Sequence, residues 1–202
     1  AFDKAGKMLG LPYPAGAAID ALAEEGRASP RLFPRPYLDN ESLDFSFSGL
    51  KTAMWNYVSA HPECRVSFDA ASGEAALPQG DRRAALADVC ASYRLAVVES
   101  LCFKVEKAFA AGAAAGAESL ILAGGVAANA LLRRRMRDIA DRHDVPLCVP
   151  SLRLCADNGA MIAYLGALLA DIGYSHSLDM EAVPRGRPIP DDMLKQFSPA
   201  AR

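Results

Sequence analysis

A short apolar run that ends in two glycines constrains the fold of this chain more than any other feature. Residues 119–123 (SLILA) lead directly into Gly124 and Gly125. A short continuous apolar run of this kind is typical of a strand covered on both faces, as in a parallel sheet. A helical pattern follows at 127–143, and a second apolar run covers 145–149. This order of strand, helix and strand predicts an α/β fold.

The rest of the chain is predicted to be mainly helical. Residues 82–111 repeat apolar side chains at helical spacing and predict one long amphipathic helix. Residues 43–47 alternate apolar and polar side chains, which is typical of a half-buried strand. Further helices are expected at 2–10, 17–26, 49–60 and 157–173, with irregular structure at 31–40 and a loop at 61–80.

We therefore expect three parts. Residues 1–112 form a mainly helical part with one strand near 43–47. Residues 113–175 form an α/β nucleotide-binding core, and residues 176–202 form an extended, proline-rich tail. The chain starts at Ala1 and runs straight into patterned sequence, which suggests a fragment of a longer protein.

Charge and cysteine content exclude several classes of protein. The 202 residues carry 22 basic and 24 acidic side chains, so any nucleic-acid contact must be a local patch. The best candidate patch is Arg133, Arg134, Arg135 and Arg137, although such a run is more often a solvated helix face. The five scattered cysteines show no CxxC spacing, which favours the cytoplasm over an oxidising compartment. The apolar stretch 159–170 is too short to span a bilayer and predicts a buried helix without a membrane partner.

The two glycines and Asn129 form the first candidate site. Paired glycines let a ligand approach the backbone, and a helix N-terminus offers unpaired N–H groups to a phosphate. The amide of Asn129 could read a base or a ribose. A tight turn in which the glycines only allow positive φ explains the same pattern equally well.

Carboxylates supply the remaining candidates. Asp3 and Asp20 flank a turn that contains Gly16, and a carboxylate can accept hydrogen bonds from both hydroxyls of a ribose. Solvated carboxylates on helix faces are the simpler reading. Asp157 is expected either to cap the helix that follows it or to bind a metal ion. The three histidines show no HxxxH spacing that would complete such a site, and no GxSxG or similar motif supports a covalent nucleophile.

Five blocks, in this order along the chain, resemble the TsaD (Gcp) family of tRNA threonylcarbamoyladenosine synthesis proteins, formerly described as O-sialoglycoprotein endopeptidases. The blocks are AFDKAGKMLGLPYPAG, FPRP, LDFSFSGLKTA, ILAGGVAAN and CADNGAMIAY. The resemblance covers nearly the whole chain but only the C-terminal part of the family's sequence, somewhat more than half.

The resemblance implies an actin-like ATPase (ASKHA) lobe with a largely helical insertion. It also implies transfer of threonylcarbamoyl from threonylcarbamoyl-AMP to the adenosine next to the anticodon of tRNAs that read codons starting with A. The implied partners are tRNA, a TsaB-like paralogue and a TsaE-like ATPase, and the implied cofactor is one divalent metal ion, iron or zinc. The family's nucleotide-contacting positions fall on Asp3, Gly16, Asp20 and Asn129, with Gly124 and Gly125 beside them, and its metal-binding carboxylate falls on Asp157.

The chain also departs from the family's pattern. The HxxxH metal ligands and the phosphate-facing Ser-Gly-Gly loop are absent, so this chain alone is expected to be inactive. Two alternatives stay open: a metal-dependent endopeptidase, and a non-catalytic nucleotide-binding scaffold lobe.

Overall fold

The computed structural model describes residues 1–35, 41–68 and 75–174. They divide into two compact units at Ala156 and Asp157, and each unit is described by itself. The three-part division expected from the sequence remains a prediction.

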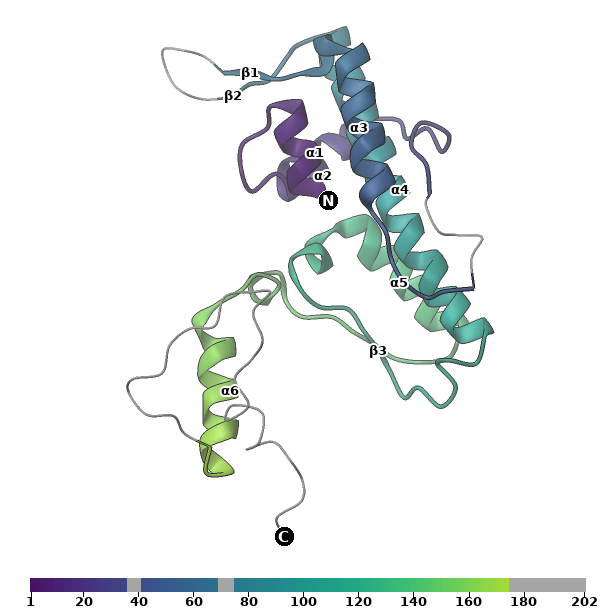
Figure 1. Cartoon of the computed structure of the whole chain (residues 1–202), viewed down its shortest axis with the longest axis vertical. Helices are drawn as coiled ribbons and strands as arrows, with labels where there is room; N and C mark the ends of the chain where they lie inside the picture. Colours follow the sequence, from purple (N-terminus) through teal and green to yellow (C-terminus); the bar gives the residue numbers. More distant parts are fainter. Residues whose placement is uncertain (36–40, 69–74, 175–202) are drawn as a thin grey trace. The chain divides into compact units, whose positions relative to one another are not determined.

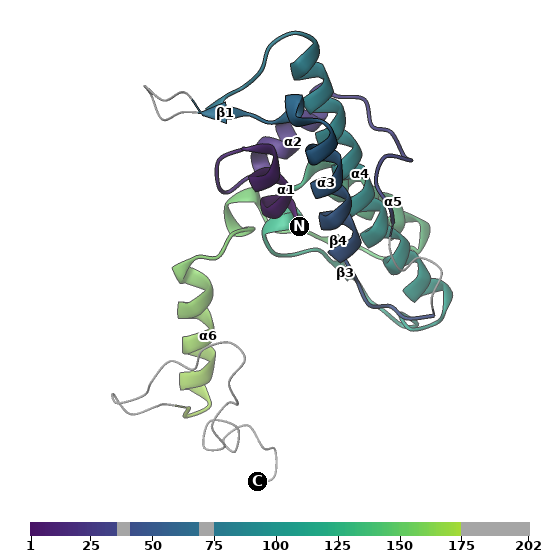
Figure 2. The same ribbon diagram turned by 45° about the horizontal axis from the view of Figure 1, so that its top comes forward.

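The first unit is built around one 30-residue helix, α4 (Asp81–Ala110). Its apolar residues recur all round the first two-thirds of the helix, so that most of this stretch is buried. Figures 1 and 2 show α1 to α3 gathered along one part of α4 and α5 along another. The helices around it are α1 (Phe2–Leu9), α2 (Gly16–Glu25), α3 (Ser48–Ala60) and α5 (Ala130–Arg142).

Two apolar clusters lie along α4. The larger cluster joins α1, α2, α3 and the first half of α4, and Tyr93 at its centre contacts the ring edges of Phe2 and Phe33 at centroid distances of 6.1 and 5.3 Å. The smaller cluster packs Val98 of α4 against Leu132, Met136 and Ile139 of α5. One helix therefore connects the N-terminal helices to the segment that carries the two glycines.

The predicted parallel sheet is present but small. Strand β3 (Leu120–Ile121) pairs in parallel with β4 (Leu147–Cys148), and α5 crosses between them. The prediction that this strand is covered on both faces is wrong for Ile121, whose side chain is 70% exposed. The two strands are short, and no described element of the first unit covers Ile121.

Two other predictions need correction. Residues 43–47 form no strand; they run as irregular chain into α3, and no strand among the described residues pairs with them. The expected loop at 61–80 contains a 3₁₀ turn, η1 (Pro62–Cys64), and a short antiparallel hairpin of β1 (Ser67–Phe68) and β2 (Ala75–Ala76). The sequence did not predict this hairpin, because strands of two residues are too short to show a pattern in a segment rich in Ser, Gly and acidic residues.

In the second unit, helix α6 (Gly159–Asp171) was predicted to be buried, and this prediction is wrong. None of its residues is buried, and Ile162 and Tyr164 are 72% and 69% exposed. The sequence reveals that the helix is apolar, but it cannot reveal what covers it. The expected tail at 176–202 lies outside the described residues. No helix in the described part of the chain is both long and apolar enough to cross a membrane.

Candidate functional site

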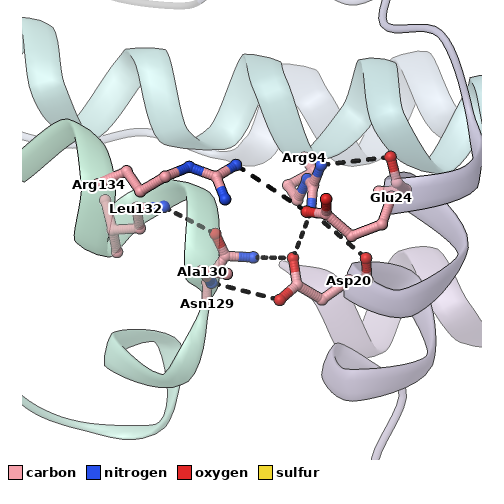
Figure 3. A network of polar contacts seen from close by, with 8 residues as sticks. Asp20, Glu24, Arg94, Asn129, Ala130, Leu132 and Arg134 are labelled. Atoms are coloured by element: carbon pink, nitrogen blue, oxygen red, sulfur yellow. Dashed lines mark hydrogen bonds and ion pairs between the residues drawn. The ribbon is translucent and has the colours of Figure 1, made fainter.

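A polar cluster forms where α2, α4 and the start of α5 meet, and Figure 3 shows it from close by. We call Asp20, Glu24, Arg94 and Asn129 the Asp20 cluster. The Oδ1 atom of Asp20 accepts hydrogen bonds from the Asn129 side-chain amide and from the Arg94 guanidinium, both at 2.8 Å. Its Oδ2 atom accepts from the backbone N–H of Ala130 at 3.3 Å. The structure thus brings together two predicted site residues, Asp20 and Asn129, that are 109 positions apart.

Arg94 is the buried cation of this cluster. Its side chain is only 8% exposed, and it donates to Glu24 at 2.5 Å and to the carbonyl of Ala23 at 3.2 Å. Burial alone lowers the pKa of Arg94, but the hydrogen bonds and charges of Asp20 and Glu24 outweigh burial, so the pKa lies above its ordinary value. Arg94 therefore remains positively charged at every physiological pH.

Sequence reasoning missed Arg94 and Glu24. The available signal was a single charged residue inside the apolar run 89–98, where an arginine must find acidic partners to be buried. Arg94 Nε is buried and has no hydrogen-bond partner among the described residues.

Asn129 caps helix α5. Its Oδ1 atom accepts a hydrogen bond from the backbone N–H of Leu132 at 2.9 Å, and the residue is 7% exposed. Asp20 takes the N–H of Ala130 in the same turn. The prediction of unpaired N–H groups at this helix start is therefore wrong for these two amides, because the protein's own side chains satisfy them. Asn129 retains one side-chain N–H and one lone pair for a ligand.

The two glycines have different structural roles. Gly124 has φ 83° and ψ 176°, a conformation that side chains with a Cβ rarely adopt. Gly125 begins a 3₁₀ turn, η2 (Gly125–Ala128), without positive φ. Both are exposed, and a Cβ on either would meet no atom of the described residues within 4 Å. The turn therefore requires only Gly124, and it leaves open space in front of both residues.

Asp3 and Gly16 lie at the junction of α1 and α2. Asp3 Oδ1 accepts a hydrogen bond of 2.9 Å from the backbone N–H of Ala15, immediately before α2 begins at Gly16. Asp3 is exposed. Gly16 and Asp20 are four residues apart and share one face of α2. Helix α2 thus connects the Asp3 junction to the Asp20 cluster.

Asp157 belongs to the second unit, and Asn158 rather than Asp157 caps α6. The Asn158 Oδ1 atom accepts from the backbone N–H of Met161 at 3.2 Å. The prediction of Asp157 as the cap is therefore wrong by one residue. No group of three or more His, Cys, Asp or Glu side chains suited to a metal ion occurs in the described part of the chain. A single carboxylate does not bind a transition metal by itself, so these residues do not form a complete metal site.

The chain matches the TsaD family, described as tRNA N6-adenosine threonylcarbamoyltransferase, over residues 1–164. The chain belongs to the TsaD family. Similar proteins named tRNA N6-adenosine threonylcarbamoyltransferase include one from Nitratidesulfovibrio vulgaris, 53% identical over 195 residues, which span 95% of this chain and 53% of the relative. One from Desulfovibrio desulfuricans is 52% identical over 195 residues, which span 96% of this chain and 52% of the relative. One from Geotalea uraniireducens is 44% identical over 184 residues, which span 91% of this chain and 48% of the relative.

The TsaD match confirms the resemblance drawn from the five sequence blocks. The matched range includes all predicted site residues, from Asp3 to Asp157. The chain spans about half the length of the curated relatives it matches. The comparisons do not favour the endopeptidase alternative, because these relatives all bear the name of the transferase.

Proposed function

We propose that this chain forms part of a tRNA N6-adenosine threonylcarbamoyltransferase. The observation that carries the proposal is the TsaD match over residues 1–164. In the proposed reaction the N6 amine of the adenosine next to the anticodon attacks the carbamoyl carbon of threonylcarbamoyl-AMP. A C–N bond forms, the bond between that carbon and the phosphate oxygen breaks, AMP leaves, and the amine loses one proton.

The chain's share of this work is to hold the adenylate. The exposed carboxylate of Asp3 and the Oδ2 atom of Asp20 have lone pairs for ribose hydroxyls, and Asn129 has a spare N–H and a spare lone pair. Gly16, Gly124 and Gly125 leave open space beside them, so a ligand can approach the backbone closely. These six residues are the proposed nucleotide site.

Positioning is the proposed mode of catalysis in this chain, and neither Cys90 nor Cys102 is proposed as a covalent nucleophile. Burial raises the pKa of the Cys90 thiol to about 12 and that of the Cys102 thiol to about 11. Both remain protonated at neutral pH, and a protonated thiol is a poor nucleophile. The Asp20 cluster is held by three helices, which suits a site that must present a bound ligand in one orientation.

The finer expectations belong to the same proposal. We extend the proposal to an actin-like ATPase lobe, to a TsaB-like paralogue and a TsaE-like ATPase as partners, and to a cytoplasmic location. Asp157 is proposed as one ligand of a divalent iron or zinc ion, with the other ligands supplied from outside this chain, and we route no reaction step through that ion. Loss of bound metal from a complete protein that carries Asp157→Ala would support this assignment.

A hybrid protein tests the proposed function. This chain would replace the matched half of the Nitratidesulfovibrio vulgaris relative, with which it is 53% identical. The hybrid, together with its partner proteins and threonylcarbamoyl-AMP, should modify tRNA, as measured by mass spectrometry of the digested nucleosides. The unaltered relative is the positive control. A folded hybrid that leaves the tRNA unmodified would contradict the proposal.

Gly125→Ala tests the nucleotide site with little disturbance of the fold. Its new methyl group meets no atom within 4 Å in the part of the chain that the structure describes, and it needs no positive φ, so the Tm should stay close to that of the parent. The methyl group would occupy the space reserved for the ligand, and we expect AMP to bind at least about tenfold more weakly, or about 1.4 kcal/mol. Isothermal titration calorimetry of the parent and variant chains measures this.

Gly166→Ala and Asn129→Ala complete that test. Gly166 is also a glycine without positive φ and without a described atom within 4 Å of a new Cβ, but it lies outside the proposed site, so its variant should bind AMP like the parent. Asn129→Ala removes a ligand contact and the α5 cap, and should weaken both AMP binding and stability. Equal AMP affinity in the parent, Gly125→Ala and Asn129→Ala would show that the nucleotide lies elsewhere.

A further inference from the structure

Helix α5 carries a strongly positive surface just beyond the Asp20 cluster. A hollow of about 420 Å³ lies along it, lined by Arg133, Arg134, Arg135, Arg137, Asp138 and Leu131. Four arginines against one aspartate give this surface a formal charge of +3, whereas the whole chain carries −2. An anion that approaches the protein is therefore drawn to this surface.

The arginines of this surface differ in how far they are already engaged. Arg133 donates to the carbonyls of Ala127 and Pro150 and to the sulfur of Cys155, so it holds the segment after β4. Arg134 is 61% exposed and approaches Glu24 at 4.0 Å. Arg135 and Arg137 are exposed and form no hydrogen bond or ion pair with the described residues. These two guanidinium groups can bind a ligand without breaking an internal contact.

A second hollow, next to Arg135, also contains arginines but has no excess of positive charge. It has a volume of about 320 Å³ and balances Arg35, Arg135 and Arg142 against Glu99, Glu106 and Asp138. Its acids are largely neutralised within the protein, since Arg35 pairs with Glu99 and Arg142 pairs with Glu106. Hydrogen bonds from Arg142 and His143 outweigh burial and hold the pKa of Glu106 below its ordinary value. The first hollow therefore attracts an anion more strongly than the second.

We propose that Arg134, Arg135 and Arg137 bind backbone phosphates of the tRNA that presents the acceptor adenosine. This inference rests on the proposed function. Guanidinium groups match phosphate oxygens in a bidentate geometry, and the surface offers only one apolar side chain, Leu131, where a protein partner would need apolar or aromatic anchors. Arg137 follows Asn129 by eight residues of a helix, a rise of about 12 Å. The arginine surface and the proposed nucleotide site are therefore two ends of one short rigid segment.

Binding of labelled tRNA to the full chain, measured by fluorescence anisotropy at several salt concentrations, tests this surface. In the variant Arg135→Gln with Arg137→Gln, affinity should fall about tenfold near 0.1 M salt, and the slope of log K against log salt should become shallower by about one to two. The matched control is Arg27→Gln with Arg65→Gln, which removes the same charge at exposed positions outside α5. The control should bind tRNA with nearly the parent's affinity and slope.

Three outcomes of this experiment would contradict the proposal or limit it. Equal losses in both double variants, or an unchanged salt slope in the α5 variant, would show that α5 does not contact the tRNA. Competition by poly-glutamate as effective as competition by tRNA at equal charge would assign the surface to acidic proteins instead. The assay needs no transfer of threonylcarbamoyl, so an inactive hybrid protein with normal arginine-dependent binding would overturn the proposed activity and not this surface.

Discussion

Replacing Arg94 by alanine should lower the free energy of unfolding of this chain by about 3 kcal/mol, because it removes the buried cation that pairs with Asp20 and Glu24. Asp20 would lose the one cationic partner that it has among the described residues, while remaining 21% exposed. The carbonyl of Ala23 would also lose its hydrogen bond. Urea unfolding followed by circular dichroism measures the change, and the slope with urea shows whether unfolding stays two-state.

Arg83→Ala is the matched control for this prediction. Arg83 also lies on α4 and also pairs with a glutamate of α2, donating two hydrogen bonds of 2.8 Å to Glu25. Its side chain is 32% exposed and that of Glu25 is 46% exposed, so water screens and replaces the contact. Its removal should shift the urea midpoint far less than removal of Arg94. Equal shifts for both variants would show that Arg94 contributes no more than a surface pair.

The helices of this fold were largely predictable because their signals are local. Glycine at the expected stop of α1 adopts the left-handed conformation, with Gly10 at φ 78°, and the 30-residue helix α4 follows its apolar periodicity to within one residue at each end. The absence of a strand at 43–47 could not be predicted in the same way. Alternating apolar and polar side chains show that a segment could form a strand. Whether it does depends on a partner strand elsewhere in the chain, which the local sequence does not reveal.

The candidate site was predictable only in part, for a related reason. The glycines, Asp20 and Asn129 stand at turns and helix starts that periodicity and spacing can locate. Their contacts could not be predicted, because the hydrogen bond between Asp20 and Asn129 depends on how α2 and α5 pack around α4. Arg94 was missed for this reason: alone, it is a charge in an apolar helix, and its role becomes visible only beside Asp20 and Glu24.

Gly6→Ala should destabilise the chain by about 2 kcal/mol, because α1 and α2 meet there without room for a methyl group. A Cβ on Gly6 would lie 2.0 Å from the Cβ of Ala15, which is itself only 1% exposed. The two helices would have to separate, and the hydrogen bond between Asp3 and the N–H of Ala15 would lengthen with them. Thermal and urea unfolding of the variant measure the loss, and weaker AMP binding is expected to accompany it.

A second substitution, at Ala15, shows whether Gly6→Ala destabilises the chain through its clash with Ala15 or for another reason. Ala15→Gly removes the methyl group that obstructs, and the nearest remaining atom of residue 15, its Cα, would lie 3.5 Å from the new Cβ, an ordinary van der Waals distance. Ala15→Gly alone should cost about 1 kcal/mol, since it loses a buried methyl group and adds backbone freedom to the unfolded chain. The double variant should then be more stable than Gly6→Ala, with a favourable coupling of about 1 kcal/mol or more between the two sites. Strictly additive losses would show that α1 and α2 are not in contact at Gly6 and Ala15, and that the junction holding Asp3 against α2 is arranged differently.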